Sequence, residues 1–356
     1  MWDVIVVGCG GAGLSLMWEL SRRGQRVLGL EASADAANPQ ANSSSSSRGH
    51  RQTYEDPLYR SLAKRSARMW SRLRPRAPLY VQSGAWLVGH PEHPMVSSVQ
   101  RTLLKTQAPH RVHPEHDVLG IAPEAVALWE PDAGWIDAQG AMDAWRRQAL
   151  DAGARLRTGA RVASVRPGDR RVDVVLDSGE SHTARRVVWC TGEVACDGTE
   201  PGSPGVERQT EFWCEVPASF DLPMFHWLDM QGAGCFGVLE RPGCLKVCLH
   251  GIQEPTQGAS WEQMSQALGR ALPSLGPVRL LRAQVKSRAM TPDREFMVGP
   301  TNSARNVWVF GGLCGHGFKM LPALAHDLAG ALTGREALPQ AWGRFDPRRM
   351  RRQAAV

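Results

Sequence analysis

The sequence predicts a composite α/β fold, in which a split, Rossmann-like domain built on a parallel sheet carries an inserted domain that is mostly antiparallel β-sheet. Three observations predict it. A strand pattern at the start of the chain runs directly into a glycine-rich turn and a helix pattern. A second strand, glycine-rich loop and helix lie near the C-terminal end. Long strand patterns separated by turns occupy much of the segment between them.

Length and composition agree with this fold class. The 356 residues correspond to one large composite domain or to roughly two or three smaller ones. The chain is 42% apolar and 22% charged, close to the globular average, which excludes disordered, collagen-like and disulfide-scaffold proteins.

The formal net charge of +7 lies partly in arginine-rich segments such as residues 348–352. No nucleic-acid recognition motif accompanies it, so we expect a solvated basic surface that attracts anionic small molecules, and no nucleic-acid partner. No run reaches 18 apolar residues, which predicts no membrane span. The eight cysteines form no CxxC pair and no signal-peptide pattern precedes the first strand, so we expect reduced thiols in a cytoplasmic protein.

The first elements form a complete strand–helix–strand pattern. Residues 3–7 are a β-branched run typical of a buried parallel strand, and residues 14–23 have apolar side chains at helical spacing. Residues 26–30 form a second strand. This context makes the glycine-rich turn after the first strand a predicted dinucleotide-binding site, with an ordinary glycine-rich turn as the alternative.

The turn reads GCGGAG over residues 8–13. Gly8 permits the tight turn, Gly10 lets the backbone approach a pyrophosphate, and Gly13 lets helix and strand pack closely. The helix N-terminus then attracts the phosphates, and Glu31, at the end of the second strand, can accept hydrogen bonds from ribose hydroxyls. The predicted cofactor-binding residues of this unit are Gly8, Gly10, Ala12, Gly13 and Glu31.

The middle of the chain alternates helix and strand patterns before it becomes rich in strands. The serine run 43–47 is typical of a flexible loop, and His110, His113 and His116 of an exposed loop rather than a metal site. We expect helices at 57–73, 141–152 and 261–271, strands at 83–88, 161–165, 172–176 and 186–190, and a mostly antiparallel sheet from 211 to 250.

Near the C-terminal end, a strand at 306–310 leads into the glycine-rich loop 311–317 and a helix at 321–332. We therefore expect one discontinuous FAD-binding domain, because nicotinamide dehydrogenases usually keep their nucleotide-binding half contiguous. The predicted segments are 1–80, 140–205 and 290–356 for this domain, and 81–139 and 206–289 for a substrate-binding, catalytic domain.

With these motifs, the chain resembles the FAD-dependent amine and amino-acid oxidases related to D-amino-acid oxidase, and most of all the branch of monomeric sarcosine oxidase and N-methyltryptophan oxidase. The resemblance covers nearly the whole chain. It rests on the first glycine turn with Glu31, RGHR at 48–51 with Tyr54, LKV at 245–247 with His250, TPD at 291–293 and, most specifically, GHGFK at 315–319.

The resemblance implies an activity. The enzyme would oxidise a CH–NH bond of a small, carboxylate-bearing amino acid, in particular a secondary or N-alkyl amine, to an imine. Reduced FAD would then pass electrons to O2 and give H2O2.

The resemblance also implies catalytic roles for four residues. Arg51 and Lys319 would hold the substrate carboxylate by charge-assisted hydrogen bonds, the alternative being two surface cations. Lys246 would lie over the flavin and stabilise negative charge on oxygen, the alternative being an exposed lysine on an edge strand. His250 matches an active-site histidine, and it would share a face with Lys246 because positions four apart in a strand do so.

Other positions match residues that contact the cofactor in that family. Ser47 and Arg48 would lie against the flavin, and the backbone of Val162 would meet the adenine. His316 and Gly317 would bring backbone N–H groups to the pyrimidine edge of the flavin, with simple packing as the alternative for His316. The remaining matched positions are Thr191, Gly192, Gly315, Phe318 and Lys319.

Two positions depart from the family pattern. A cysteine that carries the flavin covalently in that branch is replaced by Lys286, which cannot form the thioether, so we predict noncovalent FAD. Cys314 is a minor alternative for attachment, or a packing residue. Arg288 replaces an aromatic residue and would either bind a second acidic group of the substrate or point outward.

The sequence is also compatible with three other functions: a flavin-dependent amino-acid dehydrogenase with a non-oxygen acceptor, a flavin-binding protein with degenerate catalysis, and a nicotinamide dehydrogenase. The sequence does not specify the substrate side chain or the oligomeric state, and it is compatible with a monomer.

Overall fold

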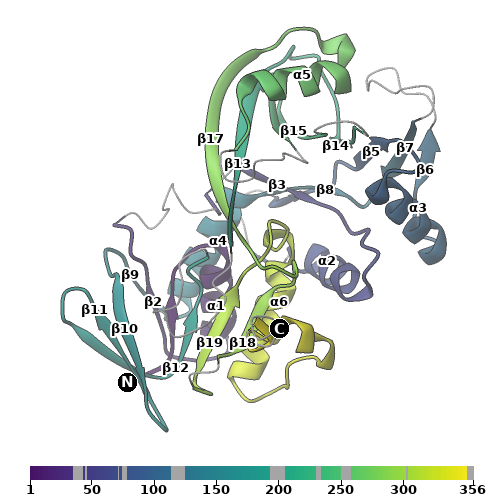
Figure 1. Cartoon of the computed structure of the whole chain (residues 1–356). Coiled ribbons are helices and arrows are strands. Elements are labelled where there is room, and N and C mark those ends of the chain that lie inside the picture. Colours follow the sequence, from purple (N-terminus) through teal and green to yellow (C-terminus); the bar gives the residue numbers. More distant parts are fainter. Residues whose placement is uncertain are drawn as a thin grey trace.

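The computed structural model describes residues 1–34, 43–44, 46–70, 72–73, 78–113, 125–192, 205–229, 234–249, 258–301 and 304–350. His250, a predicted catalytic residue, and His116 lie outside the described residues. Two eight-stranded sheets organise the chain, one in the lower half of Figure 1 and one in the upper half.

The lower sheet has a parallel core of five strands. β1 (Trp2–Val7) lies between β2 (Val27–Leu30) and β12 (Ser181–Trp189), and β9 (Arg155–Arg157) and β19 (Val307–Gly311) extend the sheet on either side. Strands from the start, middle and end of the chain therefore lie side by side, which confirms the predicted split parallel sheet. The strands β10 (Val162–Pro167), β11 (Val172–Leu176) and β18 (Met297–Pro300) add antiparallel pairs.

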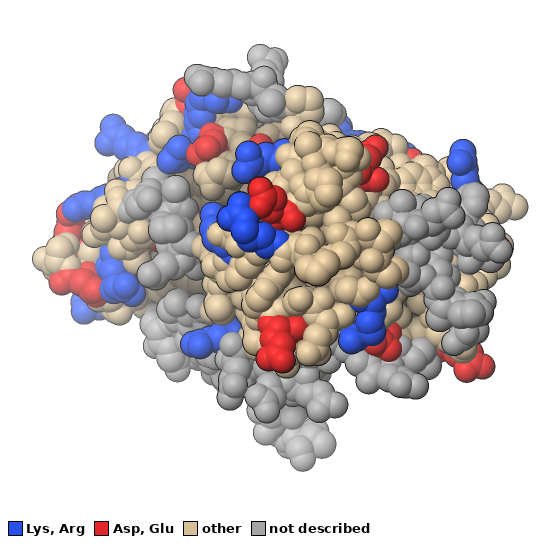
Figure 2. All heavy atoms as spheres, turned by 90° about the horizontal axis from the view of Figure 1, so that it is seen from above, with Lys and Arg blue, Asp and Glu red and all other residues tan. Residues whose placement is uncertain are grey.

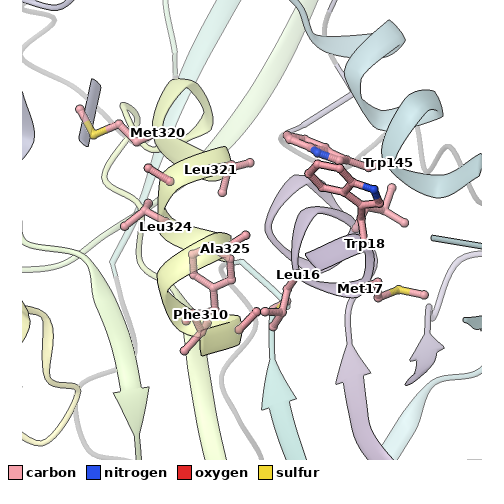
Figure 3. Packing of buried hydrophobic residues seen from close by; sticks show 14 of the residues in the cluster. Leu16, Met17, Trp18, Trp145, Phe310, Met320, Leu321, Leu324 and Ala325 are labelled. Carbon is pink, nitrogen blue, oxygen red and sulfur yellow. The ribbon is translucent and has the colours of Figure 1, made fainter. Parts of the chain in front are cut away.

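Four helices pack together on one face of this sheet: α1 (Gly11–Ser21), α2 (Pro57–Trp70), α4 (Ala138–Asp151) and α6 (Leu321–Leu332). α1 packs against α4 and α6, and nearly all of its side chains are buried, as expected for a helix that is apolar on every side. Figure 3 shows Leu16 of α1 facing α6 and Trp18 facing Trp145 of α4. This packing fixes the N-termini of α1 and α6 relative to each other, which matters for the site described below.

The upper sheet has the strand order β17-β13-β16-β15-β14-β5-β7-β6, and only the β14–β5 pair is parallel. β13 (Gly205–Glu215) and β17 (Arg279–Met290) form a long antiparallel ribbon that arches between the two halves of the molecule (Figure 1). The other strands are β5 (Ala85–Gly89), β6 (Arg111–His113), β7 (Val126–Glu130), β14 (Met224–Trp227), β15 (Cys235–Arg241) and β16 (Cys244–Leu249). The predicted, mostly antiparallel second sheet is thus confirmed.

Shorter elements complete the fold. α5 (Trp261–Ala271) begins with a capping box formed by Ser260 and Gln263, and packs on β15 and β16. α3 (Pro94–Thr106) packs on β5. A three-stranded sheet and three short 3₁₀ helices account for the remaining elements: β3 (Ser47–His50), β4 (Tyr80–Val81), β8 (Gly134–Asp137), η1 (Pro273–Leu275), η2 (Phe318–Met320) and η3 (Gln340–Phe345).

Two loop predictions were wrong in part. The end of the serine run is not a free loop, because Ser47 begins β3, which pairs with β8, and Ser43 accepts a hydrogen bond from the first glycine turn. His113 belongs to β6, an edge strand that pairs with β7, rather than to a loop. Both segments gain structure from tertiary pairing, which local composition does not report.

On the face seen from above, lysine and arginine side chains are interspersed with aspartate and glutamate (Figure 2). The positive charge is therefore not gathered into one basic area on that face. Across the part of the chain that the structure describes, no helix combines the length and the apolar character needed to cross a bilayer. The described cysteines are all buried free thiols.

Candidate active site

The first glycine turn has the geometry that requires its glycines. Gly8 has a φ of +88°, and a Cβ at this position would lie 2.9 Å from the backbone of Cys190. A Cβ on Gly13 would lie 2.0 Å from the carbonyl oxygen of Gly8. Gly8 and Gly13 therefore leave no room for larger residues, and the start of α1 has no side-chain cap. The N–H of Gly11 donates to Ser43 Oγ at 2.9 Å, so a donor at this helix N-terminus already contacts an oxygen.

The predicted ribose-binding residue, Glu31, lies beside this turn. Its Oε2 accepts from the N–H of Cys9 at 2.8 Å, and its Oε1 accepts from the N–H of Ser33 at 3.0 Å. A carboxylate has about four acceptor positions, so capacity remains for a further donor. The backbone of Glu31 also accepts from Ala160, two residues before Val162. The predicted adenine-side residue is thus close to Glu31 in the fold.

Thr191 and Gly192 follow β12 and lie next to the same turn. A Cβ on Gly8 would approach the Cα of Thr191 to 3.0 Å. Gly192 has a φ of +70°, which glycine adopts without strain. Neither of these positions lines the cavity described next, nor do Gly8, Gly10, Gly13, Glu31 and Val162.

The first and last glycine segments meet in space. A Cβ on Gly11 would lie 2.9 Å from Leu321 and 3.0 Å from Phe318. A cavity opens at this junction. Its lining includes ten of the predicted site residues: Ala12, Ser47, Arg48, Arg51, Lys246, Gly315, His316, Gly317, Phe318 and Lys319. Six lysine or arginine side chains line it among the described residues, against one carboxylate, Glu211.

Lys246 is buried at the centre of a charged cluster. Its side chain is 2% exposed, and its Nζ lies 2.8 Å from Glu211 Oε1 and donates to the Ser47 carbonyl oxygen at 2.9 Å. Arg48 donates to the same carboxylate oxygen at 3.1 Å and to the same carbonyl at 2.9 Å. Burial lowers the pKa of Lys246, and Glu211 opposes that shift. The charges of these three side chains thus sum to one net positive charge.

The alternation of side chains along β16 explains this placement. β16 is buried along its whole length, and Lys246 faces the cavity together with Cys248, two positions further on. The alternative of an exposed lysine on an edge strand is wrong, because β16 lies between β13 and β15. The corresponding prediction for His250 falls outside the described residues.

Arg51 and Lys319 line the same cavity. Lys319 donates to the hydroxyl of Tyr54 at 3.2 Å, and Arg51 Nη1 contacts Met95 Sδ at 4.0 Å. Among the described residues, neither cation has a carboxylate within ion-pair distance. Trp70 of α2 donates to the Lys319 carbonyl at 3.3 Å, which fixes the short η2 segment that carries Lys319. Both cations are therefore held in the site and remain able to bind an anion.

His316 adjoins this pair in a buried aromatic environment. Its ring lies 5.0 Å from that of Tyr59 and 4.9 Å from that of Phe296. Burial, together with the charges of Lys319 and Arg51, lowers the pKa of His316 to about 3, so the imidazole is neutral at physiological pH. The backbone N–H groups of His316 and Gly317 both donate to the Leu313 carbonyl at 3.1 Å. Their role as donors to a flavin stays a prediction, and in this structure both already have a partner.

β17 contributes two further cations to the cavity. Lys286 and Arg288 are two positions apart, so they share a face of the strand. Lys286 Nζ donates to Ser44 Oγ at 2.5 Å, and burial lowers the pKa of Lys286 to about 8. Arg288 therefore points into the cavity rather than outward.

Sequence reasoning missed several lining residues. Glu211, which pairs with Lys246, lies on β13 with Gln209 two positions before it on the same face. The alternation of polar residues along this long strand is a sequence signal from which Gln209 and Glu211 could have been predicted to line a site. Phe236 was missed as well, and it lines the cavity from β15 beside His226 of the neighbouring strand β14.

The residues present fit FAD. The first glycine turn, with glycine at four of its six positions, and the adjacent helix N-terminus suit a pyrophosphate, and Glu31 suits a ribose. The cationic cavity next to this turn is lined by Ala12 and the 315–319 segment, and it suits the anionic ring of a reduced flavin.

Comparison with known proteins decides the family. The family model described as FAD dependent oxidoreductase matches residues 3–331. The chain belongs to this family. It is therefore an FAD-dependent oxidoreductase of the D-amino-acid oxidase type, and the nicotinamide alternative is wrong.

Individual relatives of this oxidoreductase cover nearly its whole length. It is 30% identical over 384 aligned residues to a monomeric sarcosine oxidase from Streptomyces avermitilis, covering 98% of each chain. In structure it is similar to NikD, an unusual amino acid oxidase essential for nikkomycin biosynthesis, with a TM-score of 0.84, 23% identity and 97% coverage of each chain. It is also similar to L-proline dehydrogenase from P. horikoshii, with a TM-score of 0.84, 22% identity, and coverage of 99% and 98%.

Proposed function

We propose that this FAD-dependent oxidoreductase is an oxidase of a carboxylate-bearing secondary or N-alkyl amino acid. It would convert the CH–NH bond to an imine and transfer the electrons to O2, which gives H2O2. One observation carries the proposal: Arg51 and Lys319, which have no ion-pair partner among the described residues, share one cavity with the buried Lys246 at the junction of the two glycine segments. The similarity to a sarcosine oxidase supports the same substrate class.

The chain would orient the substrate by its carboxylate. Arg51 offers a planar guanidinium fork and Lys319 an ammonium group, and together they fix the position of a carboxylate and of the carbon beside it. The amine must be neutral when it reacts, and the cations around the cavity favour loss of the ammonium proton. His316 adds no charge to the cavity, because its lowered pKa keeps the imidazole neutral.

Lys246 would stabilise negative charge that develops on oxygen. Bound FAD would supply the redox chemistry by accepting two electrons from the substrate and giving them up again. A buried cation held by Glu211 and Ser47 is already oriented, so it would stabilise charge without reorganisation. This favours oxygen as the electron acceptor over the dehydrogenase alternative.

FAD would be held noncovalently. Lys286 occupies the attachment position, and its Nζ contacts Ser44. Cys314, the alternative attachment point, is buried, with its Sγ 3.2 Å from Thr291 Oγ1 and 3.1 Å from the Gly312 carbonyl. Acid precipitation of the purified protein tests this, because a noncovalent flavin stays in the supernatant and a yellow pellet would contradict the proposal.

An anaerobic screen tests the activity. Amino acids and their N-methyl derivatives are added to the FAD-loaded protein, and matched amines without a carboxylate serve as controls. We expect loss of the oxidised-flavin absorbance only with carboxylate-bearing amines, and stoichiometric H2O2 after air is admitted. No bleaching across the carboxylate-bearing set would refute the substrate class. Bleaching without peroxide would favour the dehydrogenase.

A further inference from the structure

The cavity holds more positive charge than one carboxylate requires. Arg51 and Lys319 suffice for a single carboxylate, while Lys246 and Arg48 are engaged by Glu211. Arg288 belongs to neither set, although it lines the same cavity.

Arg288 is only partly neutralised. Its Nη2 lies 3.4 Å from Glu207 Oε2, whereas Arg294 lies closer to that carboxylate, at 2.9 Å from Oε1. Its Nε is buried and has no hydrogen-bond partner among the described residues. A buried guanidinium with an unused donor is costly unless an acceptor reaches it. Arg288 lines the cavity, which is the side from which a ligand could approach its guanidinium.

The Arg288 side chain packs on the last glycine segment, which also carries Lys319. A Cβ on Gly315 would lie 3.1 Å from both Cδ and Nη1 of Arg288, so the side chain lies directly over this glycine. Lys319 lies four residues further along the same segment and also lines the cavity. Lys286 adds a second cation on the same face of β17.

We propose that Arg288 binds a second acidic group of the substrate, which makes N-substituted amino acids with two carboxylates the preferred substrate class. This deepens the proposed function and rests on it. Arg51 and Lys319 would bind the carboxylate beside the reacting carbon, and Arg288 the other one. A guanidinium is suited to this because it binds a carboxylate through two parallel hydrogen bonds.

The test compares two thioethers that cannot be oxidised as amines and differ only in the second carboxylate: (methylthio)acetate and thiodiacetate. Each is titrated into the FAD-loaded protein, and the dissociation constant is taken from the shift of the flavin spectrum. Thiodiacetate is expected to bind at least about tenfold more tightly than (methylthio)acetate, because one additional pair of charge-assisted hydrogen bonds contributes about that much affinity. In Arg288→Gln this preference should disappear while the affinity for (methylthio)acetate stays within about twofold.

Two further variants sharpen the result. Arg288→Lys keeps the charge without the fork and should retain part of the preference. Arg282→Gln changes an exposed arginine of the same strand that does not line the cavity, and it should leave the preference intact. Equal binding of the two thioethers to the unaltered protein would overturn the inference, as would an unchanged preference in Arg288→Gln. Bleaching by monocarboxylic N-methyl amino acids would still support the proposed function in those cases, whereas no bleaching by any amine would refute both.

Discussion

The oxygen-activating role of Lys246 gives the most specific prediction, and Lys246→Met tests it. Methionine is of similar length and removes the charge together with the hydrogen bond to the Ser47 carbonyl. The cluster of Lys246, Arg48 and Glu211 would change from one net positive charge to none. Glu211 keeps Arg48 at 3.1 Å, and the Ser47 carbonyl keeps its hydrogen bond from Arg48 at 2.9 Å, so the variant should fold.

The size of the effect follows from the charge that is lost. A unit charge about 4 Å from negative charge on oxygen contributes about 4 kcal/mol at an effective dielectric constant of about 20. Removal of a preoriented electrostatic group of this kind typically costs about 10²–10³ in rate. We therefore expect the second-order rate of reoxidation by O2 to fall by about 10²–10³, with flavin reduction by substrate changed less than about threefold.

Stopped-flow mixing of anaerobically reduced protein with oxygenated buffer measures this rate. The exposed Lys64 of α2 provides the matched control, and Lys64→Met should leave reoxidation unchanged. The reasoning is refuted if Lys246→Met reoxidises at the rate of the unaltered protein, or if it loses flavin reduction and reoxidation equally.

Three other predictions follow from the same geometry. Gly13→Ala should lower the free energy of unfolding, measured by denaturant titration, by about 1–3 kcal/mol or more and abolish FAD binding, because its Cβ would lie 2.0 Å from the Gly8 carbonyl oxygen. The control Gly269→Ala, in α5 with nothing within 4 Å of its Cβ, should leave the free energy of unfolding unchanged or raise it. Arg51→Gln and Lys319→Met should each raise KM for the amino acid about tenfold or more, and an unchanged KM in steady-state assays would exclude them from carboxylate binding. Thiodiacetate should bind more weakly as pH rises through about 8, because the Lys286 ammonium is charged below that pH and neutral above it. Lys286→Met should bind thiodiacetate with an affinity that no longer changes in this pH range. If the pH dependence remains in Lys286→Met, another group is responsible for it.

Much of the fold could be predicted because its elements carry strong local signals. The βαβ unit at the N-terminus and the strand, loop and helix near the C-terminal end have unbroken apolar patterns and glycines at their turns. Helix α5, with its capping box, occupies the predicted residues 261–271. α3 was missed, although Pro94 at its start and the buried Val96, Val99 and Leu103 are typical helix signals.

The candidate site was predicted less completely, for a physical reason. Motifs identify residues such as Lys246 and Lys319, but the partner of a buried charge is chosen by pairing between strands. Glu211 reaches Lys246 because β13 and β16 are antiparallel neighbours, and Lys286 lies beside β13 because β17 pairs along its whole length. Nothing in the local sequence reports such a register.

The claim on which the rest depends is that one cavity, built from both glycine segments, positions a flavin ring among these cations. A crystal structure of the FAD-loaded protein with (methylthio)acetate bound tests it most directly. The account predicts the ligand carboxylate within about 3 Å of Arg51 and Lys319, with the flavin ring beside Lys246. A carboxylate bound away from both cations, or a flavin ring outside the cavity that Lys246 lines, would contradict it.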